Sequence, residues 1–185
     1  MRKHYYYRLL LVVFTTSLIL NGCIIFHQIS YDVKLDTPTS GVASISADDM
    51  RSDAKSKPDL EKDKKNLFQH MLKSKEFVEE QKASGKYVTD RNLYIDGGKL
   101  MGEGSYKFDD ISAVEGIKYE GGFHYLNLGL DDSVISTNGE IIRSKDYKRI
   151  VWDSTFWELK FTMFSNDFTG SQYKSLAPFY EDKKK

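Results

Sequence analysis

Glycine-containing turns divide the second half of the chain into short segments of alternating polar and apolar residues. Each turn carries one or two glycines, which adopt the positive φ angles of tight hairpins at little steric cost. The sequence therefore predicts three antiparallel hairpins, and Asn-Gly is the strongest such signal. The three turns are Asp96-Gly97-Gly98, Glu120-Gly121-Gly122 and Asn138-Gly139, flanked by 86–95 and 99–108, by 117–119 and 123–130, and by 134–137 and 140–142.

Period-two alternation predicts further strands on both sides of this region. Apolar and charged residues alternate over 31–35, and a Pro- and Gly-containing turn at 37–41 leads into residues 42–47. This pattern indicates a hairpin near the beginning of the domain. Residues 149–153 and 157–163 are typical of strands, the second with one buried and one wet face.

One long segment has helical periodicity instead. Apolar residues recur on one face from Leu60 to Val78, Pro58 precedes them, and Gly85 is suited to the left-handed residue that ends a helix. The segment predicts a main amphipathic helix over about 59–83. We expect its lysines to form a solvated face. Binding of these lysines to anionic lipid headgroups is the less favoured interpretation. The expected fold class is α+β, a largely antiparallel, meander-like sheet with this helix packed on one face.

The N-terminus has the pattern of a secretory signal peptide. Arg2, Lys3 and Arg8 precede an uncharged, mostly apolar run over 9–20. Leu20-Asn21-Gly22-Cys23 follows and resembles the lipobox of bacterial lipoproteins. The resemblance implies recognition by signal peptidase II, cleavage after Gly22, and acyl chains on Cys23 that bind a membrane. An uncleaved anchor helix over 9–26 is the alternative.

This resemblance implies a domain organisation and a location. Residues 1–22 would be the signal peptide, 23–30 a lipidated tether, 31–180 a single α+β domain and 181–185 a charged tail. Ile24 stands where enteric lipoproteins retained in the inner membrane carry Asp. An outer-membrane location is therefore expected, with the domain in the periplasm or at the cell surface. The body also resembles uncharacterised small envelope lipoproteins of Gram-negative bacteria, which begin with a hairpin soon after the lipidated cysteine.

Charge and cysteine content exclude several classes of function. Removing the three basic residues of the N-terminal segment from the total of 27 leaves 24, against 27 acidic residues. A mildly acidic domain is not expected to bind nucleic acid. Cys23 is the single cysteine of the chain, so neither an intramolecular disulfide nor a multi-cysteine metal site can form.

No catalytic or metal-binding motif emerges, and we predict neither a metal nor a cofactor. His27, His70 and His124 lack the spacing of zinc ligands, and His124 is expected to be partly buried and hydrogen-bonded. Gly102-Glu103-Gly104-Ser105 lacks the Gly-Lys-Ser/Thr of a phosphate loop, so strand packing explains its glycines better. The paired aspartates at 48–49, 109–110 and 131–132 are typical of caps and turns.

Aromatic residues near two turns are the candidate partner contacts, because aromatics are enriched in protein interfaces. We therefore expect a non-catalytic binding or scaffolding module that holds a protein or another envelope component. Two alternatives remain open, a periplasmic immunity-type inhibitor of a toxin and an envelope-polymer hydrolase with a cleft that holds carboxylates. The candidate residues are Tyr119, Phe123, Tyr125, Trp152 and Trp157.

Overall fold

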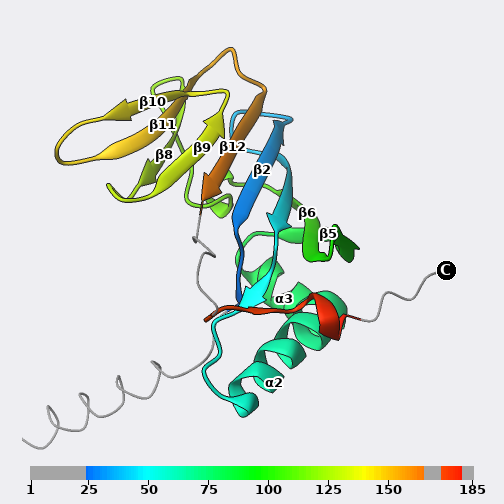
Figure 1. The fold of residues 1–185 in the computed structure, drawn as a ribbon. Helices are drawn as coiled ribbons and strands as arrows, with labels where there is room; N and C mark the ends of the chain where they lie inside the picture. Colours follow the sequence, from blue (N-terminus) through cyan, green and yellow to red (C-terminus); the bar gives the residue numbers. More distant parts are fainter. Residues whose placement is uncertain (1–23, 165–171, 181–185) are drawn as a thin grey trace, which may run out of the picture.

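A computed structural model describes residues 24–164 and 172–180 of the chain. It confirms the α+β class: antiparallel strands form three sheets, and a helical region packs against the largest of them (Figure 1). The predicted signal peptide, Cys23 and the charged tail at 181–185 lie outside the described residues.

The largest sheet has six strands in the order β5-β6-β3-β2-β12-β9, all antiparallel neighbours. Two predicted hairpins, β2–β3 and β5–β6, lie side by side in it, so its order is not that of a simple meander. Gly97 and Gly98 have φ angles of +54° and +78°, as the predicted tight turn requires. The strands are β2 (Gln28–Leu35), β3 (Gly41–Asp48), β5 (Tyr87–Asp96), β6 (Lys99–Phe108), β9 (Ser133–Thr137) and β12 (Glu158–Phe164).

A second sheet of four strands has the order β10-β11-β8-β7 and lies beside β12 and β9 (Figure 1). The predicted β7–β8 hairpin is confirmed in it. A third, small sheet has the order β1-β4-β13. These strands are β7 (Lys118–Glu120), β8 (Phe123–Leu128), β10 (Glu140–Arg143), β11 (Lys148–Asp153), β1 (Ile24–Ile25), β4 (Arg51–Ser52) and β13 (Lys174–Ser175).

The larger of the two cores fills the space between the six-stranded and four-stranded sheets. Alternation along β2 buries Tyr31, Val33 and Leu35, as predicted, and Trp152 of β11 packs against Phe161 of β12. The short helix η2 (Ile111–Ala113) contributes to the same core. Burying a large apolar side chain contributes about 1.5–3 kcal/mol, so this core is a main source of stability.

The predicted continuous helix is divided in two. α2 (Lys57–Lys65) runs without a break into the π-helical η1 (Asn66–Met71), and α3 (Lys75–Ala83) follows separately. Ser74 interrupts them with an extended ψ of 150°, and its hydroxyl caps α3 by accepting from the Phe77 amide at 3.0 Å. A serine in a helix interior competes for backbone hydrogen bonds in this way, which the apolar periodicity alone did not reveal. The predicted end is confirmed, with Gly85 at a φ of +77°.

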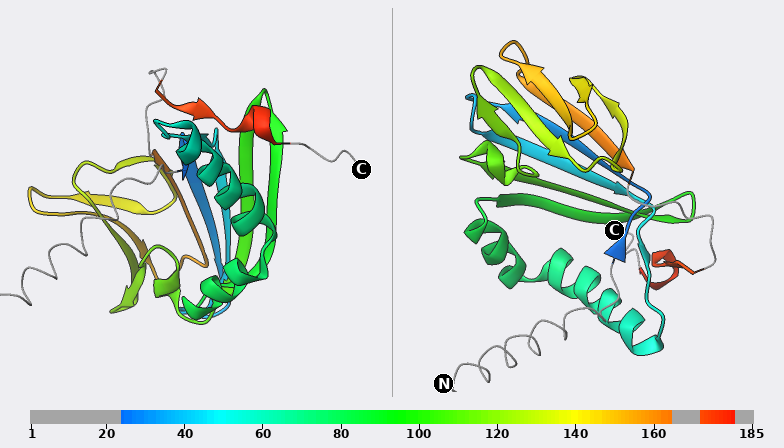
Figure 2. Two further views of the ribbon diagram at one scale, coloured as in Figure 1. Left: turned by 90° about the horizontal axis from the view of Figure 1, so that it is seen from below. Right: turned by 90° about the vertical axis from the view of Figure 1, so that its left-hand side faces the viewer.

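A second core joins the helical region to the β5–β6 end of the large sheet. Figure 2 shows the helices lying against this end, away from the four-stranded sheet. Leu67 of η1 is buried with Leu93 and Leu100, and the short helix η3 (Ala177–Phe179) closes the same core.

The prediction that residues 23–30 form a tether outside the domain is wrong for residues 24–30, which the structure describes. Ile24 and Ile25 already form β1, which pairs with β4, and β2 begins at Gln28. Ile24 also packs against the second core. Ile24 and Ile25 are half-buried and paired within the domain, so the described domain already includes Ile24.

The predicted hairpin at Asn138-Gly139 is also wrong. β9 before it belongs to the six-stranded sheet and β10 after it to the four-stranded sheet. Asn138 Oδ1 accepts hydrogen bonds from Trp152 Nε1 and from the Lys160 amide, each at 2.8 Å. These bonds fix the chain where it crosses between sheets, and neither residue has a positive φ.

Candidate functional site

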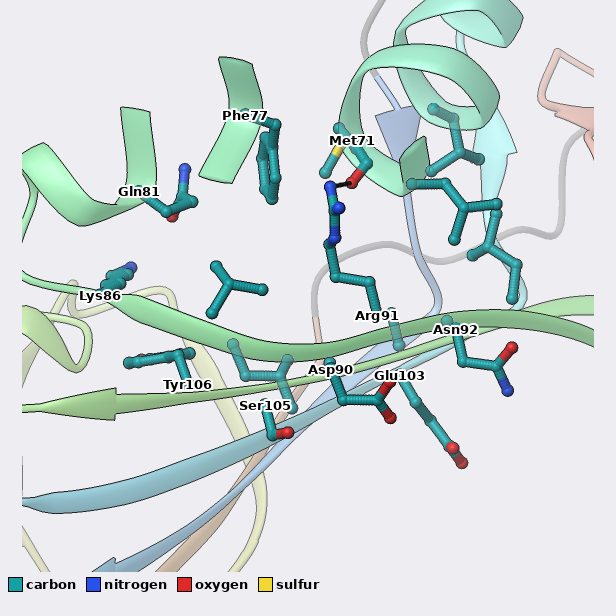
Figure 3. A pocket seen from close by; sticks show the side chains of 18 of the residues that line it. Met71, Phe77, Gln81, Lys86, Asp90, Arg91, Asn92, Glu103, Ser105 and Tyr106 are labelled. Atoms are coloured by element: carbon teal, nitrogen blue, oxygen red, sulfur yellow. Dashed lines mark hydrogen bonds between the residues drawn. The ribbon is translucent and has the colours of Figure 1, made fainter. Parts of the chain in front are cut away.

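An apolar pocket of about 210 Å³ lies between the helical break and the β5–β6 end of the large sheet (Figure 3). Its roof consists of η1 and α3, and its floor consists of β5, β6 and β3. An engineered apolar cavity of about 150 Å³ holds benzene, so this pocket has room for a somewhat larger group. Side chains that form the apolar lining include Ile45, Leu67, Met71, Leu72, Phe77 and Val88.

Two glycines of β6, Gly102 and Gly104, lie in the floor of the pocket. The structural reason for a glycine differs between the two positions. A Cβ at Gly102 would lie 2.8 Å from Met50 Sδ and 3.3 Å from Leu93, so close packing explains that glycine. A Cβ at Gly104 would meet nothing nearer than the Asp90 carbonyl at 3.5 Å, an ordinary contact. Neither glycine has a positive φ. The sequence-based explanation by strand packing therefore holds for Gly102, whereas at Gly104 a missing side chain leaves the pocket open.

Arg91 holds the helical break over the pocket. Its Nη1 donates to the Met71 carbonyl at 2.7 Å and to the Ser74 carbonyl at 3.1 Å, and the guanidinium lies 5.7 Å from the Phe77 ring. Carbonyl groups at the end of a helix lack intrahelical partners, and a cation there is favourable. π-Helical turns occur often at functional sites, and here one forms the pocket roof.

The charged groups on the helix side of the pocket are cationic. Figure 3 shows Lys86 and Arg91 on the same side of the strands as Phe77, and Asp90 and Glu103 on the opposite side. Lys86 Nζ reaches the Glu115 carboxylate only at 4.0 Å, a weak ion pair, and lies 5.4 Å from the Tyr106 ring. An anionic group bound in the pocket would therefore meet positive charge.

Tyr106 lies below Lys86 and contributes its ring to the pocket lining. Its side chain is 5% exposed, and its hydroxyl is buried without a hydrogen-bond partner. Burial, together with the nearby negative charge of Glu115, raises the pKa of this phenol well above its ordinary value. The hydroxyl is thus neutral at all physiological pH values.

The aromatic residues predicted as partner contacts are placed differently from one another. Trp157 is 55% exposed and Phe123 48% exposed, and the Tyr119 ring packs tilted against His124 at a centroid distance of 4.7 Å. The Tyr125 hydroxyl donates to Glu120 at 2.9 Å. Trp152 requires a correction, because its side chain is 0% exposed in the core between the sheets and cannot touch a partner.

The histidines occupy structural positions. His124 is 2% exposed and its Nε2 lies 2.6 Å from the Pro38 carbonyl, so the prediction of a buried, hydrogen-bonded histidine is confirmed. His70 lies on the helical surface beside Glu80, at 3.1 Å, and the His27 amide donates to the Asp48 carbonyl. Within 24–164 and 172–180, no group of three or more His, Cys, Asp or Glu side chains is arranged to hold a metal ion.

The paired aspartates include a cap, a turn and one buried carboxylate. Asp110 caps η2 by accepting from the Ser112 amide at 2.8 Å, which lowers its pKa. Asp132 accepts from the Gly129 amide at 2.6 Å. Asp49 is 4% exposed, has a φ of +52°, and pairs with Arg51 at 2.7 Å. These roles confirm the interpretation of Asp110 and Asp132 as cap and turn residues.

No protein-family model, curated protein or solved structure matches this chain. Among the described residues, no helix is both long and apolar enough to span a membrane. The function is therefore inferred from the chain's own side chains.

Sequence reasoning did not find the residues that shape the pocket. Arg91, Lys86 and Phe77 carry no motif, and each comes from a different strand, loop or helix. One signal was present: two glycines spaced by two residues on one face of β6. It pointed to a close approach, which is true of Gly102, but it could not reveal that Gly104 faces open space.

Proposed function

We propose that this protein is a lipid-anchored envelope protein that binds an anionic amphiphile, with the apolar part of the ligand held in the pocket between α3 and the sheet. The observation that carries this proposal is that Gly104, in the floor of the pocket, has room for a side chain but lacks one. A strand glycine costs about 0.5–1 kcal/mol relative to alanine, and here neither backbone strain nor a neighbour requires it. Keeping this position empty preserves space for a ligand.

The chemistry of the pocket supports an amphiphile with a negative head group. Its interior is lined by aliphatic, aromatic and methionine side chains, which favour an alkyl chain or a ring. Lys86 and Arg91 supply positive charge on the same side. Long-chain carboxylates and acyl phosphates have this combination of groups, and both belong to membrane environments.

The anchor remains a proposal based on the Leu20-Asn21-Gly22-Cys23 motif. It is compatible with a domain that begins at Ile24, because a lipidated Cys23 would then hold the domain close to a bilayer. Membrane lipids and their breakdown products would be the nearest source of such ligands. The proposed role is binding rather than catalysis, and an outer-membrane location follows only from the motif.

The test measures binding of octanoate to the full chain in lipid nanodiscs by calorimetry, with empty nanodiscs subtracted. We expect saturable 1:1 binding, weaker by about tenfold for octylamine, whose head group is cationic. Gly104→Val fills the pocket and should abolish binding, while the melting temperature stays the same or rises. Lys107→Val is the matched control, because it places the same side chain on the opposite face of β6, outside the pocket lining.

Two results would contradict the proposal. Equal affinity of Gly104→Val and wild type for octanoate would show that the ligand binds elsewhere. Equal binding of octanoate and octylamine would show that Lys86 and Arg91 do not select the head group. Release of a soluble product from an envelope polymer by the purified protein would favour the hydrolase alternative instead.

A further inference from the structure

The outer face of the six-stranded sheet carries a second hollow, of about 600 Å³, on the side opposite the apolar pocket. Its centre is lined by short hydroxyl side chains rather than by the long charged residues that usually cover an exposed sheet. We call this surface the hydroxyl trough. Its central members are Ser30, Ser44, Ser46, Ser105, Ser136 and Thr162.

The strand register arranges the side chains of the trough in two parallel rows. One row runs across five strands as successive cross-strand neighbours, beginning at Ser136 and ending at Glu103. The second row begins at Lys160 and ends at Asp90. In order, the rows are Ser136, Thr162, Ser30, Ser46 and Glu103, and Lys160, Asp32, Ser44, Ser105 and Asp90.

Hydroxyl groups in the trough already form the kind of bonds that they would offer to a ligand. Ser30 Oγ lies 3.0 Å from Thr162 Oγ1, and Thr89 Oγ1 lies 2.9 Å from Ser105 Oγ. A hydroxyl donates one hydrogen bond and accepts two, so each pair of hydroxyls can form further hydrogen bonds with a ligand. Sugar hydroxyls likewise both donate and accept hydrogen bonds.

The charge of the trough limits which ligand it can accept. The charged lining residues are three carboxylates, from Asp32, Asp90 and Glu103, and one ammonium group, from Lys160. Lys160 Nζ lies 3.4 Å from Asp32 Oδ2, while Asp32 Oδ1 is buried without a hydrogen-bond partner. The excess of carboxylates disfavours phosphate-rich or uronic acid polymers.

We propose that the hydroxyl trough binds an oligosaccharide that is neutral or carries amino groups. A volume of about 600 Å³ is within the usual range of about 300–1,000 Å³ for ligand sites. Hydroxyls of the sugar would bond to the two rows of side chains, and amino groups would lie close to the carboxylates of Asp32, Asp90 and Glu103. This site is independent of the apolar pocket, which lies on the other face of the sheet.

The experiment uses the full chain in lipid nanodiscs, free of sugar-based detergent, and isotope-labelled for NMR. The probes are the trimers of N-acetylglucosamine, glucosamine and galacturonic acid. We expect saturable shifts of trough amides with one or both of the first two trimers and none with the anionic trimer. Ser44→Phe, which blocks the centre of the trough, should weaken binding by about tenfold or more.

Lys107→Phe is the matched control, because it lies on the same face of β6 outside the trough. It should bind sugar like wild type, and Ser44→Phe should keep the wild-type amide shifts away from the trough, which would show that it is folded. Absence of saturable shifts up to about 1 mM of every trimer would overturn the proposal. Equal binding by Ser44→Phe, or preference for the galacturonic acid trimer, would overturn it as well.

Discussion

Arg91 and Gly104 are direct cross-strand partners in β5 and β6, so a long cationic side chain lining the apolar pocket stands beside a residue that has no side chain. Arg91 reaches the helical break, and Gly104 leaves the floor below it open. Arg91 therefore holds the roof of the pocket in place, whereas Gly104 keeps the interior of the pocket empty.

The first prediction concerns the roof. Arg91→Met keeps the length of the side chain but loses both bonds to the Met71 and Ser74 carbonyls. Hydrogen bonds from a charged donor contribute about 1.5–3 kcal/mol, so we expect the free energy of unfolding to fall by about 2 kcal/mol. Urea unfolding measures this change. Asn92→Met, on the opposite face of β5, should be nearly neutral, and equal losses in both variants would contradict the assigned role of Arg91.

The second prediction concerns the buried Tyr106 hydroxyl. Tyr106→Phe removes a polar atom without a partner, so the protein should become more stable by about 1–2 kcal/mol at neutral pH. A less stable variant would mean that the hydroxyl has a partner after all. Tyr147→Phe, at a 42% exposed ring, is the control and should change little.

The same residue predicts how stability depends on pH. Burial and Glu115 raise the folded-state pKa of Tyr106, whereas an unfolded tyrosine loses its proton near pH 10. Ionisation of this phenol leaves the free energy of unfolding unchanged below about pH 10 and lowers it as the pH rises toward the folded pKa, because the unfolded state then releases the proton first. The slope of stability against pH above about 10 should therefore be shallower in Tyr106→Phe than in wild type.

A further prediction concerns the crossing between the sheets. Asn138→Ala leaves the Trp152 indole N–H buried without its acceptor, and we expect a loss of about 2–3 kcal/mol in urea unfolding. Gly139→Ala should also destabilise, because a Cβ there would lie 2.6 Å from Trp152 Nε1. Asn127→Ala, at an exposed position of β8, is the matched control. Wild-type stability in Asn138→Ala would show that the crossing does not depend on this side chain.

The last prediction tests the anchor through the intact mass of the membrane-extracted protein. We expect loss of residues 1–22 and added acyl mass at Cys23, both blocked by an inhibitor of signal peptidase II. Cys23→Ala should leave an unprocessed precursor or a soluble protein. A full-length, unmodified mass would indicate the alternative of an uncleaved anchor helix and would remove the basis for an outer-membrane location.

Local patterns in the sequence were sufficient for many individual elements. The alternation in β2 and β12 predicted their buried faces, and the glycine pairs at 97–98 and 121–122 predicted the turns of two hairpins. Gly85 predicted the end of the helical region. These features depend on residues a few positions apart, because side-chain period and turn geometry are local properties.

Only the tertiary structure decided how these elements combine. Asn138-Gly139 has the sequence of a hairpin turn, yet Trp152 holds it in a crossing between two sheets, and Trp152 itself is buried rather than exposed. Arg91 of a distant strand bonds to the carbonyl groups at the helical break, and the pocket at Gly104 forms only because α3 and η1 lie above it. The sequence by itself determined the α+β class and most strands, whereas both candidate sites arise from contacts between residues far apart in the chain, which no local pattern encodes.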